Sequence, residues 1–219
     1  TPAPRGHFDK DPFSFVTVPA VSRKLHVRLL ENLARAEELS NTSPYNFEQG
    51  DGAWGIICNG VSYAYAADAL QDLAIEERTR ILRIGYSHPL PRARVKAFLA
   101  SCEKVLVVEE GEPFMEEAVK AVAQEAGLTL PIRGKAEDLF SRLYEFDPAM
   151  VRRVMAGYFK VAHIESMPPD LSDVPEIPQR PPNLCAGCSH RATFYAVKKA
   201  TEGLDTIHPS DIGWMNGVD

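Results

Sequence analysis

Residues 54–132 alternate between short apolar runs and stretches of helical periodicity, and this alternation constrains the fold more than any other feature. Short apolar-rich runs occur at 55–59 and 81–85, where Asn59 and Arg83 are the polar exceptions, and an uninterrupted apolar run occurs at 105–108. Such runs are typical of strands that are covered on both faces, as in a parallel sheet. The segments between them place apolar residues three and four positions apart, which indicates amphipathic helices. We therefore expect an α/β fold: a doubly wound, mostly parallel sheet flanked by helices, with a partial second domain after it.

The same pattern predicts which side chains form the core. Cys58 falls in a predicted strand and Cys102 on the apolar face of a predicted helix, so both are expected to be core residues. Ser62 is expected to cap the helix that follows the first strand. The strand residues expected to be buried are Ile56, Ile57, Leu82, Ile84, Leu106 and Val108.

Further elements are expected on both sides of this region. Before it, apolar residues at helical spacing predict an amphipathic helix over 21–39. After it, the sequence predicts a short strand over 128–132 and more helix over 137–160, with a break at Pro148. Residues 205–209 have the composition of another strand start.

The composition of the chain excludes several classes of protein. At 219 residues, with 45% hydrophobic and 25% charged residues, the chain has enough apolar material for a globular core. A net charge of −6 argues against nucleic acid as the main partner. No apolar run reaches the roughly 20 residues that a membrane helix needs. Four cysteines are too few and too uneven for a disulfide framework, which favours a cytoplasmic location.

The segment with the strongest chemical character is a C-x-x-C pair that follows a Pro-rich stretch. Cys185 and Cys188 could hold one metal ion or cluster iron, could form a redox pair, or could be two unbound thiols in a turn. His190 and Arg191 open a predicted helix, whose first N–H groups favour anions such as a diphosphate. His190 could equally cap that helix, and Arg191 could pair with a nearby carboxylate.

Residues 180–195, RPPNLCAGCSHRATFY, resemble the R-P-P-x-L-C-x-G-C-x-H-R-x-T-F-Y signature of the large (alpha) subunit of indolepyruvate:ferredoxin oxidoreductase. The resemblance extends to VLVVEEGEPFMEE at 105–117 and SHPLP at 87–91. It also includes FVTVPA at 15–20 and SPYN at 43–46. The similarity covers nearly the whole chain, which would be only the middle of such a subunit.

The resemblance implies four regions. Residues 1–52 would be the tail of a pyrimidine-binding domain, and 53–165 a middle domain similar to the C-terminal domain of transketolase. Residues 166–183 would be a Pro-rich linker, and 184–219 the start of a thiamine-diphosphate-binding domain. In the indolepyruvate branch of these enzymes a further cysteine is expected just after residue 213, where this sequence has Trp214.

The resemblance also implies an activity and its cofactors. The full enzyme would use thiamine diphosphate, Mg²⁺ and 4Fe-4S clusters to decarboxylate an aryl pyruvate oxidatively to its acyl-CoA. Its partners would be a smaller beta subunit, ferredoxin and coenzyme A. Cys188, His190 and Arg191 would face the cofactor, and Cys185 with Cys188 would be metal ligands. The catalytic residues would lie outside these 219 residues, so the chain alone is expected to be inactive.

Other patterns have simpler interpretations. Gly50-Asp51-Gly52 resembles the opening of a thiamine-enzyme metal motif, but no asparagine follows at the required distance, so we reject it. The acidic run at 109–117 lies at the end of a predicted strand, where ligand crevices form. Most of it suits the N-terminus of the next helix, which leaves Glu109 or Glu110 as candidates for a domain interface. The alternative function is a non-catalytic α/β interaction module with a C-x-x-C zinc half-site.

Overall fold

The computed structural model describes residues 10–164, 170, 172–175, 178 and 186–208. The chain divides into two compact units at residue 166. Most of the predicted linker, residues 166–183, lies outside the described residues, as do Cys185 and Trp214.

The first unit contains a five-stranded sheet in the order β1-β3-β2-β4-β5. Three strands form its centre: β2 (Trp54–Asn59), β3 (Thr79–Ile84) and β4 (Lys104–Val108). They are parallel to one another, and the short β5 (Ile132–Arg133) continues the parallel arrangement beside β4. At the other edge β1 (Phe47–Gly50) pairs antiparallel with β3. The predicted mostly parallel α/β sheet is confirmed.

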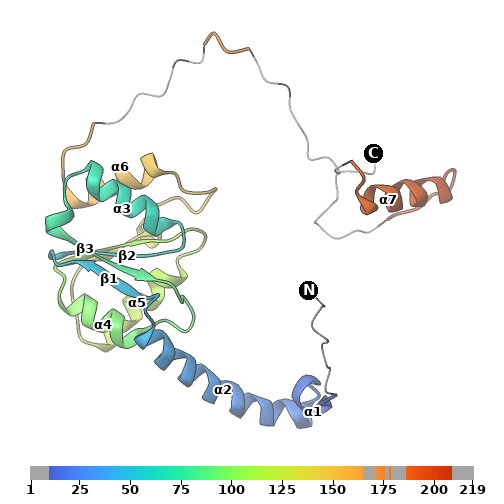
Figure 1. Ribbon diagram of the computed structural model, residues 1–219, viewed down its shortest axis with the longest axis horizontal. Coiled ribbons are helices and arrows are strands. Elements are labelled where there is room, and N and C mark those ends of the chain that lie inside the picture. Colours follow the sequence, from blue (N-terminus) through green and yellow to red (C-terminus); the bar gives the residue numbers. More distant parts are fainter. Residues whose placement is uncertain (1–9, 165–169, 171, 176–177, 179–185, 209–219) are drawn as a thin grey trace, which may run out of the picture. The chain divides into compact units, whose positions relative to one another are not determined.

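Helices cover both faces of this sheet (Figure 1). One face packs against α3 (Ser62–Asp72) and α6 (Pro148–Phe159), and the other against α4 (Arg92–Ala100) and α5 (Phe114–Glu125). Two short 3₁₀ helices, η1 (Glu76–Arg78) and η2 (Lys135–Glu137), precede β3 and follow β5. The chain passes from β2 to β3 on one side of β2, and it then crosses to β4 on the other side of β2. The direction in which successive strands are added therefore reverses between β2 and β4.

The buried strand residues are those that the sequence predicts. Ile56 lies opposite Ile81 on one side and Leu106 on the other, and all three are at most 1% exposed. Alternate residues of each strand point to opposite faces, so each strand contributes to two separate apolar clusters. All six predicted core residues are buried: Ile56, Ile57, Leu82, Ile84, Leu106 and Val108.

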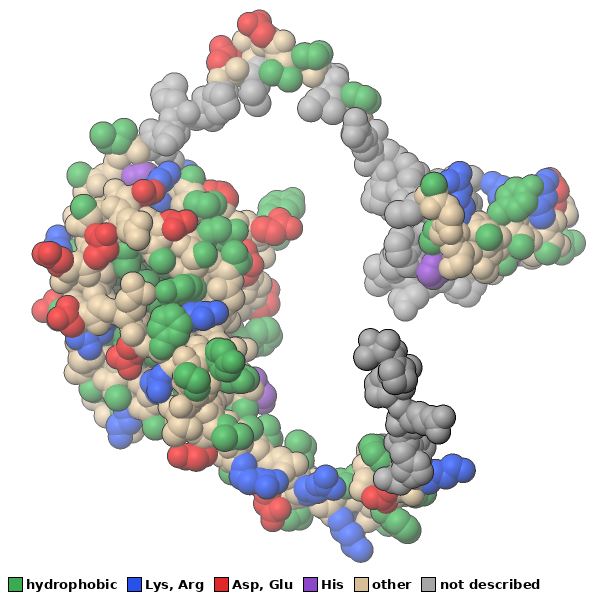
Figure 2. All heavy atoms as spheres, in the orientation of Figure 1, with side chains coloured by type: hydrophobic (Ala, Val, Ile, Leu, Met, Phe, Trp, Pro, Cys, Tyr) green, Lys and Arg blue, Asp and Glu red, His purple; other side chains and the backbone are tan. Residues whose placement is uncertain are grey.

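Two helices precede the sheet, α1 (Pro12–Phe15) and α2 (Pro19–Thr42). The helix predicted over 21–39 is therefore present and somewhat longer. Only Ser40 on α2 is fully buried, whereas Val27, Leu29 and Leu30 are more than half exposed. Figure 2 shows hydrophobic and basic side chains together along this segment. Among the described residues, no helix is long and apolar enough to cross a membrane.

Several local predictions are wrong. The expected strand over 128–132 shrinks to Ile132–Arg133, and the expected helix before Pro148 is mostly irregular. Asp147, whose side chain accepts a hydrogen bond from the Met150 N–H, starts α6 instead. The N-cap of α3 is Val61 and not Ser62, which is buried in its first turn. Residues 205–208 do not form a strand.

Candidate functional site

The predicted cofactor-facing residues lie at the start of α7 (Ser189–Ala200), the helix described in the second unit. Cys188 is the N-cap residue with extended backbone, and no side chain caps the helix end. Gly187 before it has a φ of +78°, a left-handed conformation that glycine adopts without strain. The first turn begins with Ser189, His190 and Arg191 and contains no acidic residue. This end of α7 therefore presents backbone donors with no carboxylate competing for them.

Cys188 and His190 contact each other through their side chains. The Cys188 Sγ lies 3.4 Å from the His190 Nδ1, and His190 and Arg191 are both exposed. In the described part of the chain, no group of three or more His, Cys, Asp or Glu side chains is arranged as a metal site. Because Cys185 falls outside that part, the pairing of the two cysteines stays a prediction. A histidine two residues from a thiol can accept its proton or donate to the thiolate, depending on the tautomer.

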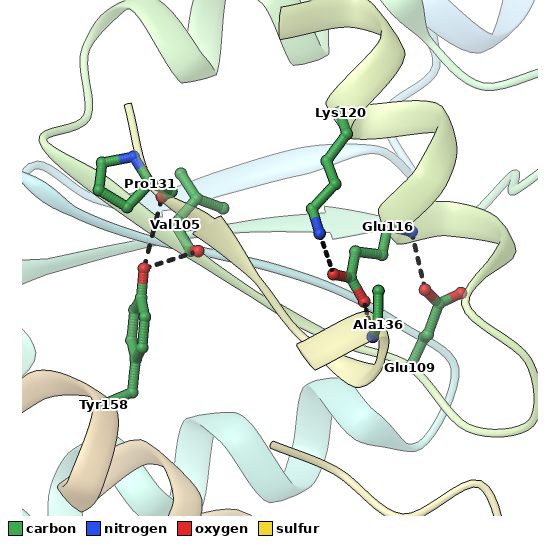
Figure 3. Close-up of polar contacts among 7 residues, drawn as sticks. All are labelled: Val105, Glu109, Glu116, Lys120, Pro131, Ala136 and Tyr158. Carbon is green, nitrogen blue, oxygen red and sulfur yellow. Dashed lines mark hydrogen bonds and ion pairs between the residues drawn. The ribbon is translucent and has the colours of Figure 1, made fainter. Parts of the chain in front are cut away.

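The acidic run after β4 has structural partners. The Glu109 carboxylate, 4% exposed, accepts hydrogen bonds from the N–H groups of Met115 (2.8 Å) and Glu116 (2.7 Å) at the start of α5. Figure 3 shows the contact with Glu116. Burial raises the pKa of the Glu109 carboxyl, while these two backbone donors act to lower it. Glu109 thus caps α5 from the preceding strand, and its carboxylate stabilises the positive end of the helix.

Glu116 connects α5 to the segment after β5. Its side chain is fully buried; one oxygen lies 2.7 Å from the Lys120 Nζ, and the other accepts a hydrogen bond from the Ala136 N–H at 3.0 Å (Figure 3). Gly134 allows this approach, because a Cβ at that position would lie 2.6 Å from the Glu116 carboxylate. Loss of these partners would leave the buried Glu116 carboxylate uncompensated, so Glu116 is a structural residue.

Two further contacts complete the same edge. Glu110 accepts a hydrogen bond from the Phe146 N–H at 2.9 Å. Lys135, only 2% exposed, donates to the Ser141 carbonyl oxygen, with its Nζ 4.2 Å from the centre of the Phe146 ring. Burial lowers the pKa of the Lys135 ammonium, and the acidic groups around it oppose this effect. No sequence pattern marks Lys135 as buried, because a lone lysine after a short strand is ordinarily solvated.

The Gly50-Asp51-Gly52 segment is a packed turn. A Cβ on Gly52 would lie 2.0 Å from the backbone of Arg78, so only glycine fits there. Arg80 donates hydrogen bonds to the carbonyl oxygens of Asp51 and Gly52, each at 2.6 Å. Packing at the start of β3 therefore accounts for the Gly50-Asp51-Gly52 sequence, which only resembles a metal motif.

Asn46 is a polar residue that the sequence analysis missed. It is fully buried, and its Nδ2 donates to the Ser40 carbonyl oxygen (2.7 Å) and hydroxyl (3.0 Å). Its Oδ1 accepts from the N–H groups of Gly85 (2.7 Å) and Tyr86 (3.1 Å). One amide thus ties the end of α2 to the loop after β3. An asparagine beside serine and proline reads as a turn residue, so no pattern distinguishes it.

The cysteines differ in chemical environment. Burial raises the pKa of the Cys58 thiol to about 12 and that of Cys102 to about 11. Cys58 is fully buried in β2, which confirms its prediction as a core residue. Cys102 follows α4 instead of lying on it, and it is only partly buried against the core. Cys188 is partly exposed.

This difference predicts the order of alkylation. At about pH 8, these pKa values would leave about one Cys58 thiol in ten thousand and about one Cys102 thiol in a thousand as the thiolate, which is the species that reacts. Of the three cysteines that the structure describes, we expect iodoacetamide to modify Cys188 first, Cys102 slowly, and Cys58 only after unfolding. Peptide mass spectrometry over a time course measures this order, with the urea-unfolded chain as the control in which every cysteine reacts. Equal rates for Cys58 and Cys188 in the folded chain would contradict it.

Sequence comparisons identify relatives over nearly the whole chain. No protein-family model matches it. It is 38% identical over 216 residues to indolepyruvate oxidoreductase subunit IorA of Methanothermobacter thermautotrophicus. It is 41% identical over 218 residues to the subunit of the same name from Thermococcus kodakarensis. Each alignment covers 95% of this chain, but only 34% and 32% of the two relatives.

Solved structures give more distant matches. A 2-oxoglutarate:ferredoxin oxidoreductase from Magnetococcus marinus, determined with 2-oxoglutarate, coenzyme A and succinyl-CoA bound, aligns at 20% identity and a TM-score of 0.45. That alignment covers 64% of this chain and 23% of the other. A split-gene transketolase aligns at 17% identity and a TM-score of 0.40, over 53% and 41% of the two chains.

The curated relatives bear out the resemblance carried by residues 180–195 and the segments before them. The chain is a relative of indolepyruvate oxidoreductase subunit IorA over 95% of its own length, and it spans about a third of the length of that subunit.

Proposed function

We propose that this chain is part of a thiamine-diphosphate-dependent 2-oxoacid:ferredoxin oxidoreductase that converts aryl pyruvates, with coenzyme A, to acyl-CoA and carbon dioxide. The observation that carries the proposal is the 38–41% identity to IorA subunits across 95% of the chain. Because the chain spans about a third of those relatives, the activity would belong to the complete protein. Its partners would be a smaller beta subunit and ferredoxin.

The start of α7 fits one end of thiamine diphosphate. Its first N–H groups lack a side-chain cap, and no acidic residue lies in its first turn. A diphosphate is the type of anion that such a helix end binds. We propose that these N–H groups and the Arg191 guanidinium hold diphosphate oxygens, and that His190 orients the cofactor or its neighbour. In this proposal Cys188, His190 and Arg191 are the cofactor-facing residues.

The described residues do not fit a complete Mg²⁺ or 4Fe-4S site. The first turn of α7 has no carboxylate for Mg²⁺, and Cys188 is the only cysteine described there. An iron–sulfur cluster of this type needs four cysteine ligands. In this proposal the remaining ligands come from other parts of the complete protein. The chain alone should therefore bind thiamine diphosphate weakly and turn over no 2-oxo acid.

When bound, thiamine diphosphate supplies the carbanion chemistry that decarboxylates 2-oxo acids. The contribution of this chain is to hold the diphosphate through α7 and to position His190 beside it. The two roles differ in their kinetic effect. Loss of a diphosphate contact weakens cofactor binding, whereas loss of an orienting contact lowers turnover at saturating cofactor.

The proposed function is tested with the complete protein that contains this chain, co-expressed with its smaller subunit. We expect indolepyruvate and phenylpyruvate to reduce an electron acceptor only when coenzyme A and thiamine diphosphate are present. Pyruvate and 2-oxoglutarate serve as the substrate controls. Metal and sulfide analysis of the same sample should find iron with acid-labile sulfide. Stoichiometric zinc with no turnover of any 2-oxo acid would instead support the interaction module.

In that complex, His190→Ala should lower kcat by about tenfold or more, because small displacements of reacting groups are costly. Arg191→Lys should mainly weaken thiamine diphosphate binding, since lysine keeps the charge but not the planar donor pair. His190 is exposed, so thermal unfolding should be unaffected and serves as the control for both variants. An unchanged kcat for His190→Ala would mean that the histidine has no role beyond the helix start.

A further inference from the structure

A cavity lies where α2 ends and the sheet begins. Its volume is about 430 Å³, within the range of small-molecule sites. It is bounded by the last turns of α2, the loop that leads to β1, and the loop between β3 and α4. This position is at the carboxyl end of a parallel strand, where α/β sheets bind ligands. The side chains that line it with rings and apolar groups include those of Leu39, Pro44, Tyr45, Tyr86, His88 and Pro89.

The cavity is held in shape by buried hydrogen bonds. Asn46 lies behind it and binds Ser40 of one wall and Tyr86 of the other through its side-chain amide. Asn41 adds a second connection, because its Oδ1 accepts from the N–H groups of Ala93 (3.1 Å) and Arg94 (3.4 Å) at the start of α4. A cavity with fixed walls loses little conformational entropy when a ligand enters.

The walls carry flat rings. The Tyr45 and Tyr86 rings are 6.1 Å apart at an interplanar angle of 75°, an edge-to-face arrangement. The two residues are 63% and 49% exposed. Two proline rings stand beside them. Ring faces that are not fully covered by protein are available for stacking on a planar ligand.

Two nearly buried hydroxyls supply donors. Ser40 and Ser43 line the cavity and are 3% and 8% exposed. Each accepts a hydrogen bond: Ser40 Oγ from the Asn46 Nδ2, and Ser43 Oγ from the Tyr45 N–H at 3.2 Å. Within residues 10–164 neither hydroxyl donates one. A buried hydroxyl hydrogen that has no acceptor is costly, so an acceptor oxygen on a ligand would stabilise both.

From these observations we propose that the cavity binds a small planar aromatic molecule with a carboxylate or carbonyl group. The ring stacks on the tyrosine and proline rings, and the oxygen accepts from Ser40 and Ser43. The argument for this site does not rest on the proposed cofactor contacts of α7.

The test uses the 219-residue chain and a matched pair of acids, phenylacetate and cyclohexylacetate. Both have the same charge and side chain, and differ only in the aromatic ring. We expect phenylacetate to shift the amide NMR signals of Tyr45 and Tyr86 with a Kd on the order of 1 mM, as its size allows. Cyclohexylacetate should bind several-fold more weakly.

Variants separate the two contacts. Tyr86→Leu should weaken phenylacetate binding about fivefold, whereas Tyr86→Phe, which keeps the ring, should bind as the parent does. Ser40→Ala should weaken the acid but not toluene, which has no acceptor oxygen. Phe114→Leu, at an exposed position outside the cavity, is the control for general surface effects. Unchanged signals elsewhere in the spectrum show that each variant is folded.

Three outcomes would overturn the proposal: no saturable shift of the cavity signals up to the solubility limit of phenylacetate, equal binding of cyclohexylacetate, or equal binding by Tyr86→Leu. The first would mean that the cavity takes no small aromatic acid. The other two would mean that it is merely apolar.

Discussion

Leu106→Asp is expected to unfold the sheet-containing unit. Leu106 is fully buried in β4, between Ile56 of β2 and Arg133 of β5 in the strand register. The change removes a buried aliphatic side chain, worth about 2 kcal/mol, and adds a carboxylate with no partner, which costs several kcal/mol more. The sum, more than about 5 kcal/mol, approaches the whole stability of a typical domain.

Urea unfolding followed by far-UV circular dichroism measures this effect. Leu143→Asp is the matched control, because the same substitution there falls on a side chain that is 69% exposed. We expect the control to retain the midpoint of the parent chain within error. A cooperative transition of Leu106→Asp near the parent midpoint would show that β4 is not a buried strand.

Asn46→Asp should be the second most destabilising change, although it replaces one group by another of the same size. The Asn46 Nδ2, which donates to the Ser40 carbonyl oxygen and hydroxyl, would become an oxygen facing that carbonyl. Because the position is fully buried, the new charge would also be desolvated. We expect a loss of about 3 kcal/mol in the free energy of unfolding, measured by the same urea titration.

Asn41→Asp, near the end of α2, provides the comparison. Asn41 uses only its Oδ1, which accepts from Ala93 and Arg94 at the start of α4, so an aspartate can make both bonds. A negative charge at a helix N-terminus is favourable by a few tenths of a kcal/mol. The stability should therefore stay the same or rise slightly. Equal losses for the two variants would mean that the Asn46 amide is not the connection described here.

The sheet was largely predictable, because strands buried on both faces leave a direct pattern in the sequence. The runs at 55–59, 81–85 and 105–108 correspond to β2, β3 and β4 within one or two residues. In contrast, β1 has the sequence FEQG and only one partly buried residue. An exposed edge strand of four residues has neither an apolar run nor a clear alternation, so nothing distinguishes it from a loop.

Side-chain contacts were harder to predict, for a different reason. The acidic run after β4 was correctly interpreted as mostly helix-terminal, but the partners of Glu109 and Glu116 depend on how α5 and β5 meet. Such pairings join residues up to 20 positions apart and follow no spacing rule. The predicted roles of Cys188, His190 and Arg191 came from a resemblance to a family, and they stay proposals until the complete enzyme is tested.

The antiparallel pairing of β1 with β3 has a consequence for how the molecule avoids self-association. Residues 47–50 pair with one side of β3 over Arg80–Arg83. Without them, the backbone N–H and C=O groups on that side would be free to hydrogen-bond with a strand of another chain. A chain shortened to begin at residue 53 would keep the parallel core but leave that side of β3 bare. Such a chain would be prone to recruit a second copy or to aggregate. β1, which is short and mostly exposed, thus protects β3 from pairing with a strand of another chain, and its lack of a hydrophobic pattern suits that role.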